Sequence, residues 1–193
     1  KLQDVQNALD NQIARAQTIV SGINNSYLVR QFALNVRQNK SGDAYLLYQM
    51  LNDLQHRKAA SESLYIDDLV LFLNQYNKAY TGGVVLSLEL EENRDETVWT
   101  QALPSMRIDT LNERFSLQNT QILCNKTFLI YQDAYRYAAG EPRGQICVLF
   151  DKDGISSMLN QLAGETCGWA FQWNGETLLE QGRTEGVVFE GTS

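Results

Sequence analysis

The sequence predicts an α+β domain in which a long N-terminal helix and short flanking helices pack on an antiparallel sheet of about five to six strands. Three observations support this fold class: an amphipathic stripe over the first 23 residues, strands that follow one another in hairpins, and the absence of a βαβ order or a Gly-rich phosphate motif. The 193 residues suffice for one good-sized core.

The first 60 residues are expected to be helical. Apolar residues recur at three- and four-residue steps and predict one long helix with a single stripe, formed by Leu2, Val5, Leu9, Ile13, Ala16, Val20 and Ile23. Asn24–Ser26 provides a break and a new N-cap, and a short helix follows over 27–36. Asp43 then caps a third helix with apolar positions at Tyr45, Leu47, Tyr48, Leu51 and Leu54. The long stripe suits packing against a sheet or against a second copy of the chain, and both alternatives stay open.

Strands begin after residue 61. A strand over 64–73 and a returning edge strand over 78–81 are joined by an Asn-rich turn. The segment 84–119 is mixed, with helices expected around 86–92 and 96–103 and irregular chain after Pro104. Further along the chain we expect strands over 121–137 and 143–151, a short helix over 155–162, strands over 169–173 and 177–179 around the Asn174-Gly175 turn, and a strand over 187–189. Trp169 and Trp173 share a strand face and are interpreted as core residues.

Composition excludes several classes of protein. The formal charge is −7 and no basic run occurs, so we expect no nucleic-acid partner. A hydrophobic content of 44% excludes intrinsic disorder. No stretch of about 18 apolar residues occurs, so no transmembrane helix is predicted.

The residues that usually carry catalysis or metals are scarce. The single histidine, His56, lies in a polar helical stretch, and no C-x-x-C motif occurs, so we expect no enzymatic activity, no metal and no cofactor. The cysteines Cys124, Cys147 and Cys167 are interpreted as small buried hydrophobes, or as one Cys124–Cys147 disulfide if their strands are neighbours. Asp67 and Asp68 are adjacent on a strand and point to opposite faces, so they cannot share an ion, although either one alone can line a site.

Three segments carry a resemblance to a known family, and they are SLYIDDLVLFLNQYN, TFLIYQDAYRYAAGEPRGQICVLFDKDGISSML and WAFQWNGETLLEQG. Together with the amphipathic first helix, they resemble the Cache family of extracytoplasmic sensor domains, which are PAS-like sheets preceded by a long helix. The form they resemble is the membrane-distal module of double-Cache receptors of Gram-positive bacteria. The resemblance implies a helical region over 1–60, a PAS-like sensor domain over 61–180, and a segment over 181–193 that leads toward a membrane-proximal unit or the membrane.

The resemblance also implies a function. Such domains bind a small solute at the extracellular face of the membrane and pass the change through helices to a histidine kinase, a chemoreceptor output or an AraC-type regulator. They are often dimers through the N-terminal helix and are tethered to the membrane, here by segments outside this chain. The alternatives are a cell-surface interaction or assembly domain without a small ligand, and a hydrolase with an unusual carboxylate site.

Candidate ligand-binding residues come from the resemblance and from strand alternation. Asp151 matches the place where the amino-acid-binding subgroup holds an ammonium, although a strand-end turn acceptor is the plainer interpretation. The chain lacks that subgroup's Arg-x-Trp-Tyr run. Trp99 and Arg107 lie in the variable segment where the family's pocket lid forms, and the alternative is an ordinary core Trp and a surface Arg.

The strand after residue 127 presents two faces. One carries Phe128, Ile130, Gln132 and Ala134, and it is the better fit to a packed helix. The other carries Thr127, Leu129, Tyr131, Asp133 and Tyr135, and it suits a half-open cavity or a solvated sheet face. The candidate ligand-binding residues are therefore Trp99, Arg107, Tyr131, Asp133, Tyr135 and Asp151.

Overall fold

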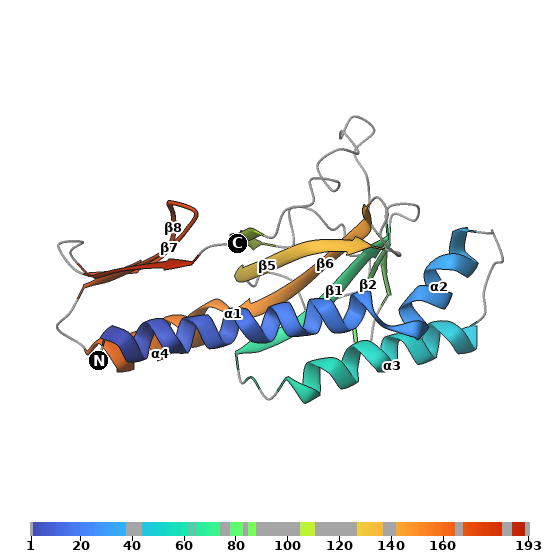
Figure 1. The fold of residues 1–193 in the computed structure, drawn as a ribbon, viewed down its shortest axis with the longest axis horizontal. Helices are drawn as coiled ribbons and strands as arrows, with labels where there is room; N and C mark the ends of the chain where they lie inside the picture. Colours follow the sequence, from blue (N-terminus) through green and yellow to red (C-terminus); the bar gives the residue numbers. More distant parts are fainter. Residues whose placement is uncertain are drawn as a thin grey trace.

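The structure, a computed structural model, describes residues 2–37, 44–61, 63, 65–73, 78–82, 85–87, 105–110, 127–136, 142–164, 168–182 and 187–191. Within these residues the helices are α1 (Leu2–Asn24), α2 (Tyr27–Arg37), α3 (Ala44–Ala60) and α4 (Lys152–Ala163). The strands are β1 (Ile66–Leu73), β2 (Lys78–Tyr80), β3 (Val85–Ser87), β4 (Ser105–Thr110), β5 (Thr127–Arg136), β6 (Pro142–Asp151), β7 (Trp169–Trp173), β8 (Glu176–Gln181) and β9 (Val187–Gly191). This element order confirms the predicted α+β class (Figure 1).

The predicted long helix is α1, and its apolar stripe packs against the protein's own sheet. The stripe residues Val5, Leu9, Ile13, Ala16, Val20 and Ile23 are all buried. They join one core cluster with Tyr131 of β5 and Val148 of β6. The stripe is therefore used for internal packing, and a dimer through α1 stays a prediction.

The break between the first two helices forms at the predicted place. Ser26 caps α2, because the Val29 N–H donates to the Ser26 Oγ at 3.3 Å. The Ser26 hydroxyl in turn donates to Oδ2 of Asp53 on α3 at 2.6 Å. The start of α2 is thus fixed to the middle of α3.

The predicted apolar positions of α3 divide between the core and the surface. Leu54 is fully buried together with Met50, and Leu47 and Leu51 pack against the core. Tyr45 and Tyr48 lie on the exposed side of the helix, and they are 67% and 62% exposed. The leucines of the predicted set therefore face the core, and the tyrosines face solvent.

A six-stranded antiparallel sheet forms the centre of the molecule, in the order β3-β2-β1-β6-β5-β4. The longest pairings join β6 to β1 on one side and to β5 on the other. Two expectations are wrong here: residues 85–87 form strand β3 where a helix is expected, and residues 105–110 form strand β4 where irregular chain is expected. Both strands lie at sheet edges, where a neighbour on one side supplies hydrogen bonds that local sequence does not reveal.

A second, smaller sheet has the order β8-β7-β9. The predicted Asn174-Gly175 turn joins β7 to β8, and both turn residues have positive φ, 49° and 83°. Strand β9 pairs with β7 in parallel, which the sequence analysis does not anticipate. The domain boundary expected at residue 180 falls inside this sheet and stays a prediction.

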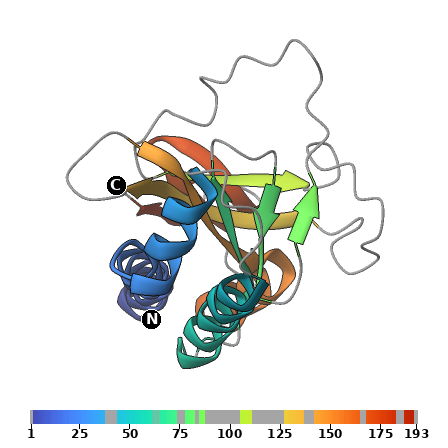
Figure 2. The ribbon, with the colours of Figure 1, turned by 90° about the vertical axis from the view of Figure 1, so that its right-hand side faces the viewer.

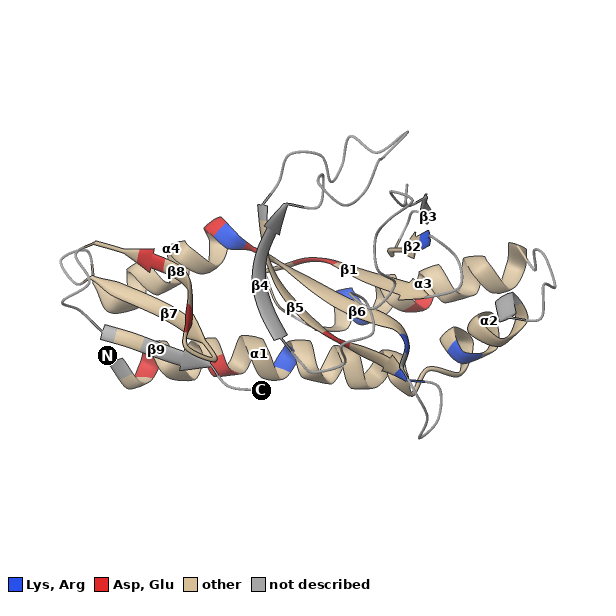
Figure 3. Cartoon of the chain, turned by 90° about the horizontal axis from the view of Figure 1, so that it is seen from above, with Lys and Arg blue, Asp and Glu red and all other residues tan. Residues whose placement is uncertain are grey.

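Helix α1 runs past both sheets. Figure 2 shows α1 and α3 on the same side of the six-stranded sheet. Figure 3 shows the small sheet beside the N-terminal half of α1 and the large sheet farther along it. Within the described part of the chain, no helix combines the length and hydropathy needed to cross a bilayer.

Candidate functional site

The six-stranded sheet has two buried faces, and they differ in what packs on them. The face toward α1 carries Leu129, Tyr131, Ile146, Val148 and Phe150, which join the core cluster of the helices. Alternate residues of the same strands point the other way. We call this opposite side the far face and define it by its buried residues Val70, Phe72, Phe128, Ile130, Ala134, Gln145, Cys147 and Leu149.

Gln145 is a buried polar residue within the far face. It pairs in register with Phe72 on β1 and with Ala134 on β5, so apolar side chains flank it on both sides. It is 4% exposed, and its Oε1 has no hydrogen-bond partner among the described residues. A buried amide oxygen without a partner costs about 1–3 kcal/mol. A ligand group that donates a hydrogen bond to this oxygen offsets that cost.

Asp68 adds a carboxyl group to the same side of the sheet. It pairs in register with Leu149, and paired residues of antiparallel strands share a face. Burial raises the pKa of the Asp68 carboxyl, while the Leu69 N–H, which donates to its Oδ1 at 2.8 Å, and the ammonium of Lys58 oppose the rise. A perturbed carboxyl beside an apolar face is typical of binding sites.

Three of the predicted site residues lie on the face toward α1. Tyr131 and Tyr135 are each 1% exposed, and both belong to the core cluster of the helices. Burial raises the pKa of the Tyr131 hydroxyl, Asp133 raises it further, and a hydrogen bond with Gln17 of α1 lowers it. Asp133 is half-buried, and its Oδ1 accepts the Ala134 N–H at 2.6 Å.

The choice of face for the helix is therefore wrong in the sequence analysis. The helix packs on the Tyr131 side of β5, and the Ile130 side belongs to the far face. Both sides of β5 are apolar enough to be buried, so alternation separates the two faces without showing which one receives the helix. Whether Tyr131, Asp133 or Tyr135 contacts a ligand stays a prediction.

The other three predicted site residues do not join that group. Asp151 ends β6, pairs with Phe128 of the far face and occupies the N-cap position of α4, where its side chain makes no capping hydrogen bond. Arg107 lies on β4 in register with Ile130. Trp99 lies outside the described residues. The structure thus places Asp151 toward one face of the sheet and the β5 tyrosines toward the other.

No group of three or more His, Cys, Asp or Glu side chains in the described part of the chain is placed to hold a metal ion. Cys147 is a buried thiol on β6, in agreement with the interpretation of the cysteines as small hydrophobes. Cys124 and Cys167 lie outside the described residues.

Solved structures of similar fold come from bacterial receptors. The sensory domain of the Campylobacter jejuni chemoreceptor Tlp3 with isoleucine bound aligns at a TM-score of 0.52 and 13% identity, over 93% of this chain and 67% of that one. The same domain with L-valine gives 0.53 and 13%, with the same coverage. The Vibrio cholerae histidine kinase DctB sensor domain gives 0.54 and 11%, over 84% of this chain and 57% of that one. No protein-family model and no curated protein matches the chain.

The chain has the fold of these sensory domains. The likeness confirms the fold that the resemblance to the Cache family predicts, since a long helix precedes an antiparallel sheet in the order expected. The chain spans 67% of the Tlp3 domain and 57% of the DctB domain, so it corresponds to part of each.

Sequence reasoning missed one polar residue of the far face and left another without a role. Gln145 is absent from the predicted site, although an amide inside the otherwise apolar run of β6 is a usable signal. Asp68 is noted only as a residue able to line a site. For both residues, the role depends on whether the side chain points toward α1 or toward the far face, and this is decided by where α1 packs.

Proposed function

We propose that the chain is the sensing part of a transmembrane signalling receptor and binds a small solute on the far face of the six-stranded sheet. The buried Oε1 of Gln145, for which the described residues supply no hydrogen-bond partner, carries this proposal, because it offers an acceptor in an apolar setting. The fold shared with the Tlp3 and DctB sensory domains supports it. The Oε1 of Gln145 favours a solute with a hydrogen-bond-donating group. Asp68 and Asp151 lie on the same side of the sheet, but level with β6 positions that are roughly 13 and 20 Å along the strand from Gln145.

The proposed module is not an enzyme and sits at the extracellular face of the membrane, anchored by segments beyond this chain. Binding shifts a receptor only through a difference in affinity between its two signalling states. Helix α1 is the element suited to transmit this shift, since its stripe packs on the face of the sheet that lies opposite the proposed site.

A thermal-shift screen of the chain against amino acids, amines, carboxylates, sugars and nucleobases tests the proposal. A ligand at about a hundred times its Kd adds roughly 2.7 kcal/mol to the free energy of unfolding. For a chain of this size we expect the midpoint of unfolding to rise by about 5–10 °C. Hits confined to one chemical class support a specific site, and a flat screen contradicts it.

The variant Gln145→Leu separates a ligand-binding role from a structural one. Replacing an amide whose buried Oε1 has no hydrogen-bond partner among the described residues by an apolar side chain leaves the unliganded chain about as stable as before. The same change removes the acceptor and weakens binding by roughly tenfold. Ile146→Val, one position along β6 on the opposite face, is the matched control, and we expect it to leave the affinity unchanged. Full affinity in Gln145→Leu rejects the far-face site.

A second candidate function is a cell-surface interaction domain. Three exposed tyrosines on α2 and α3 favour it, namely Tyr27, Tyr45 and Tyr48. A flat ligand screen, together with loss of self-association or partner capture in Tyr45→Ser, supports this alternative.

A further inference from the structure

A groove lies between α1 and the end of α3, on the helix side of the molecule and away from the far face. Its volume is about 370 Å³, which is the scale of a small-molecule site. Positions 11, 14, 15, 18 and 19 of α1 line one wall, at the three- and four-residue steps of a single helix face. Residues 57, 60 and 61 from the end of α3 line the other wall.

Two arginines line this groove. The Nη1 of Arg15 donates to the backbone oxygen of Ser61 at 2.8 Å, and this acceptor is neutral. The Nε of Arg57 lies 2.9 Å from Oδ2 of Asp53, which balances part of its charge. One arginine of the groove lining therefore comes from α1 and one from α3.

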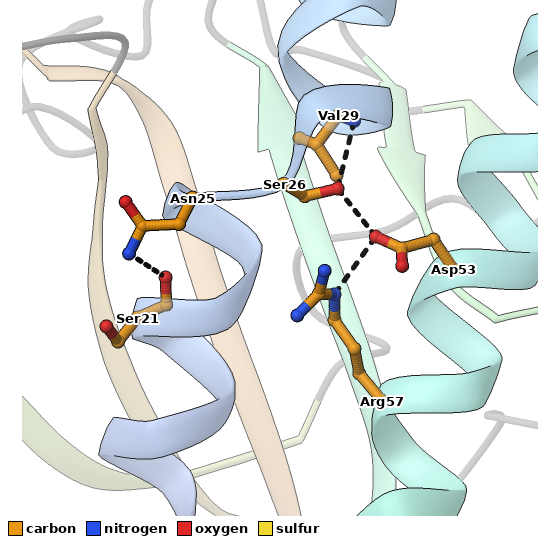
Figure 4. A network of polar contacts seen from close by, with 6 residues as sticks. All are labelled: Ser21, Asn25, Ser26, Val29, Asp53 and Arg57. Carbon is orange, nitrogen blue, oxygen red and sulfur yellow. Dashed lines mark hydrogen bonds and ion pairs between the residues drawn. The ribbon is translucent and has the colours of Figure 1, made fainter.

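The Arg57 guanidinium reaches across to α1. Figure 4 shows its Nε bonded to Asp53 while the two terminal nitrogens point toward α1. A Cβ added at Gly22 lies 2.5 Å from the Arg57 Nη1, so the absence of a side chain at this position leaves room for the guanidinium. Gly22 follows Arg15 by seven positions, a rise of about 10 Å along the helix. The Arg57 guanidinium thus lies beside α1 about two helical turns from the Arg15 position.

The rest of the lining combines apolar and hydroxyl or amide groups. Ala14, Ile19 and Ala60 contribute apolar surface, and Asn11 and Thr18 contribute polar surface. A bare inorganic anion makes no use of apolar walls. A carboxylate on a short hydrocarbon chain uses both the walls and the planar guanidinium fork, which matches carboxylate geometry.

We propose that this groove is a second solute site, which binds a small organic carboxylate between α1 and α3 through Arg15, with the Arg57 side chain in the opposite wall. The site is separate from the far face, because the six-stranded sheet lies between them. A ligand bound in the groove contacts both α1 and α3. It therefore affects the position of α1 independently of the solute that binds on the far face.

Calorimetric titration of the whole chain with butyrate, glutarate and inorganic phosphate, in a carboxylate-free buffer at constant ionic strength, tests the proposal. We expect saturable binding of the organic acids, with phosphate weaker than either. Arg15→Gln should weaken binding about tenfold or more, since a charge-assisted hydrogen bond is lost. Gly22→Ala crowds the Arg57 guanidinium without changing any charge, and we expect it to weaken binding as well.

Two controls make the outcome decisive. Arg143→Gln removes an exposed positive charge on β6, and Gln145→Leu alters only the far face; we expect both to keep the affinity within about twofold. The proposal is overturned if neither acid binds saturably, if Arg143→Gln weakens binding as much as Arg15→Gln does, or if phosphate binds as tightly as the organic acids. Circular dichroism of each variant verifies that it is folded.

Discussion

At the scale of single residues, Asp68 shows how burial changes the behaviour of a carboxyl group. Its strand places it beside apolar neighbours, and the loss of water around it disfavours the charged form. The N–H of Leu69 and the ammonium of Lys58 offset only part of this cost, so the pKa stays above its ordinary value of 3.8. The sequence shows the carboxylate but not its burial.

Replacing Asp68 therefore has a pH-dependent effect on stability. The folded chain holds the Asp68 proton more tightly than the unfolded chain, so this group makes the free energy of unfolding fall as the pH rises from 3.8 through the raised pKa. Above the raised pKa, this group lowers the free energy of unfolding by a constant amount. We expect Asp68→Asn to be more stable than the native chain at about pH 7 and equal to it at about pH 3. Urea unfolding at both pH values measures the difference.

The control for this experiment is Asp10→Asn, which removes an exposed carboxylate from α1. We expect its stability to follow that of the native chain at both pH values. The raised pKa of Asp68 is contradicted if Asp68→Asn and the native chain differ in stability by the same amount at both pH values.

At the scale of elements, hydrogen-bonding detail fixes how α2 and α3 meet. Ser26 accepts from the Val29 N–H and donates to Asp53, and Asp53 also accepts from the Arg57 Nε (Figure 4). The sequence predicts the break and the cap, because Asn and Ser are favoured N-cap residues. It does not predict the link to α3, because Asp53 is brought to Ser26 only by the packing of two helices.

The variant Ser26→Ala should lower the free energy of unfolding by about 1–2 kcal/mol, since it removes a cap and leaves Asp53 one donor short. Ser21→Ala, one turn earlier on the exposed face of α1, should change stability by less than about 0.5 kcal/mol. Denaturant unfolding of both variants gives the comparison. Equal stability of the two variants is the result that contradicts this network.

At the scale of the whole molecule, α1 joins two sheets. Tyr131 of the large sheet and Trp173 of the small sheet meet edge to face, with ring centroids 6.2 Å apart and an interplanar angle of 88°. The Trp169 Nε1 also donates to Oδ1 of Asn160 on α4 at 2.7 Å, which connects the small sheet to the helix before it. These contacts make the small sheet part of the same core.

A double-mutant cycle with Tyr131→Leu and Trp173→Leu measures this connection. We expect a coupling of about 0.5–1.5 kcal/mol in the free energy of unfolding, as for other buried aromatic pairs. Pairing Trp173→Leu with Phe72→Leu on the far face is the control and should be additive within about 0.5 kcal/mol. Additivity in the Tyr131 cycle itself shows that the small sheet is energetically independent.

The sequence by itself determined the helices of the first 60 residues, the strands β1, β5, β6 and β7, and the Asn174-Gly175 turn, because each follows from a local period, cap or turn residue. Only the tertiary structure decided which face of β5 receives α1, that residues 85–87 and 105–110 pair as edge strands, and that β9 lies parallel to β7. It also decided that the Gln145 Oε1 is buried with no hydrogen-bond partner in the described part of the chain, while the tyrosines of β5 are core residues. These features depend on contacts between segments distant in sequence, and a strand with two apolar faces fits either arrangement until a helix packs on one of them.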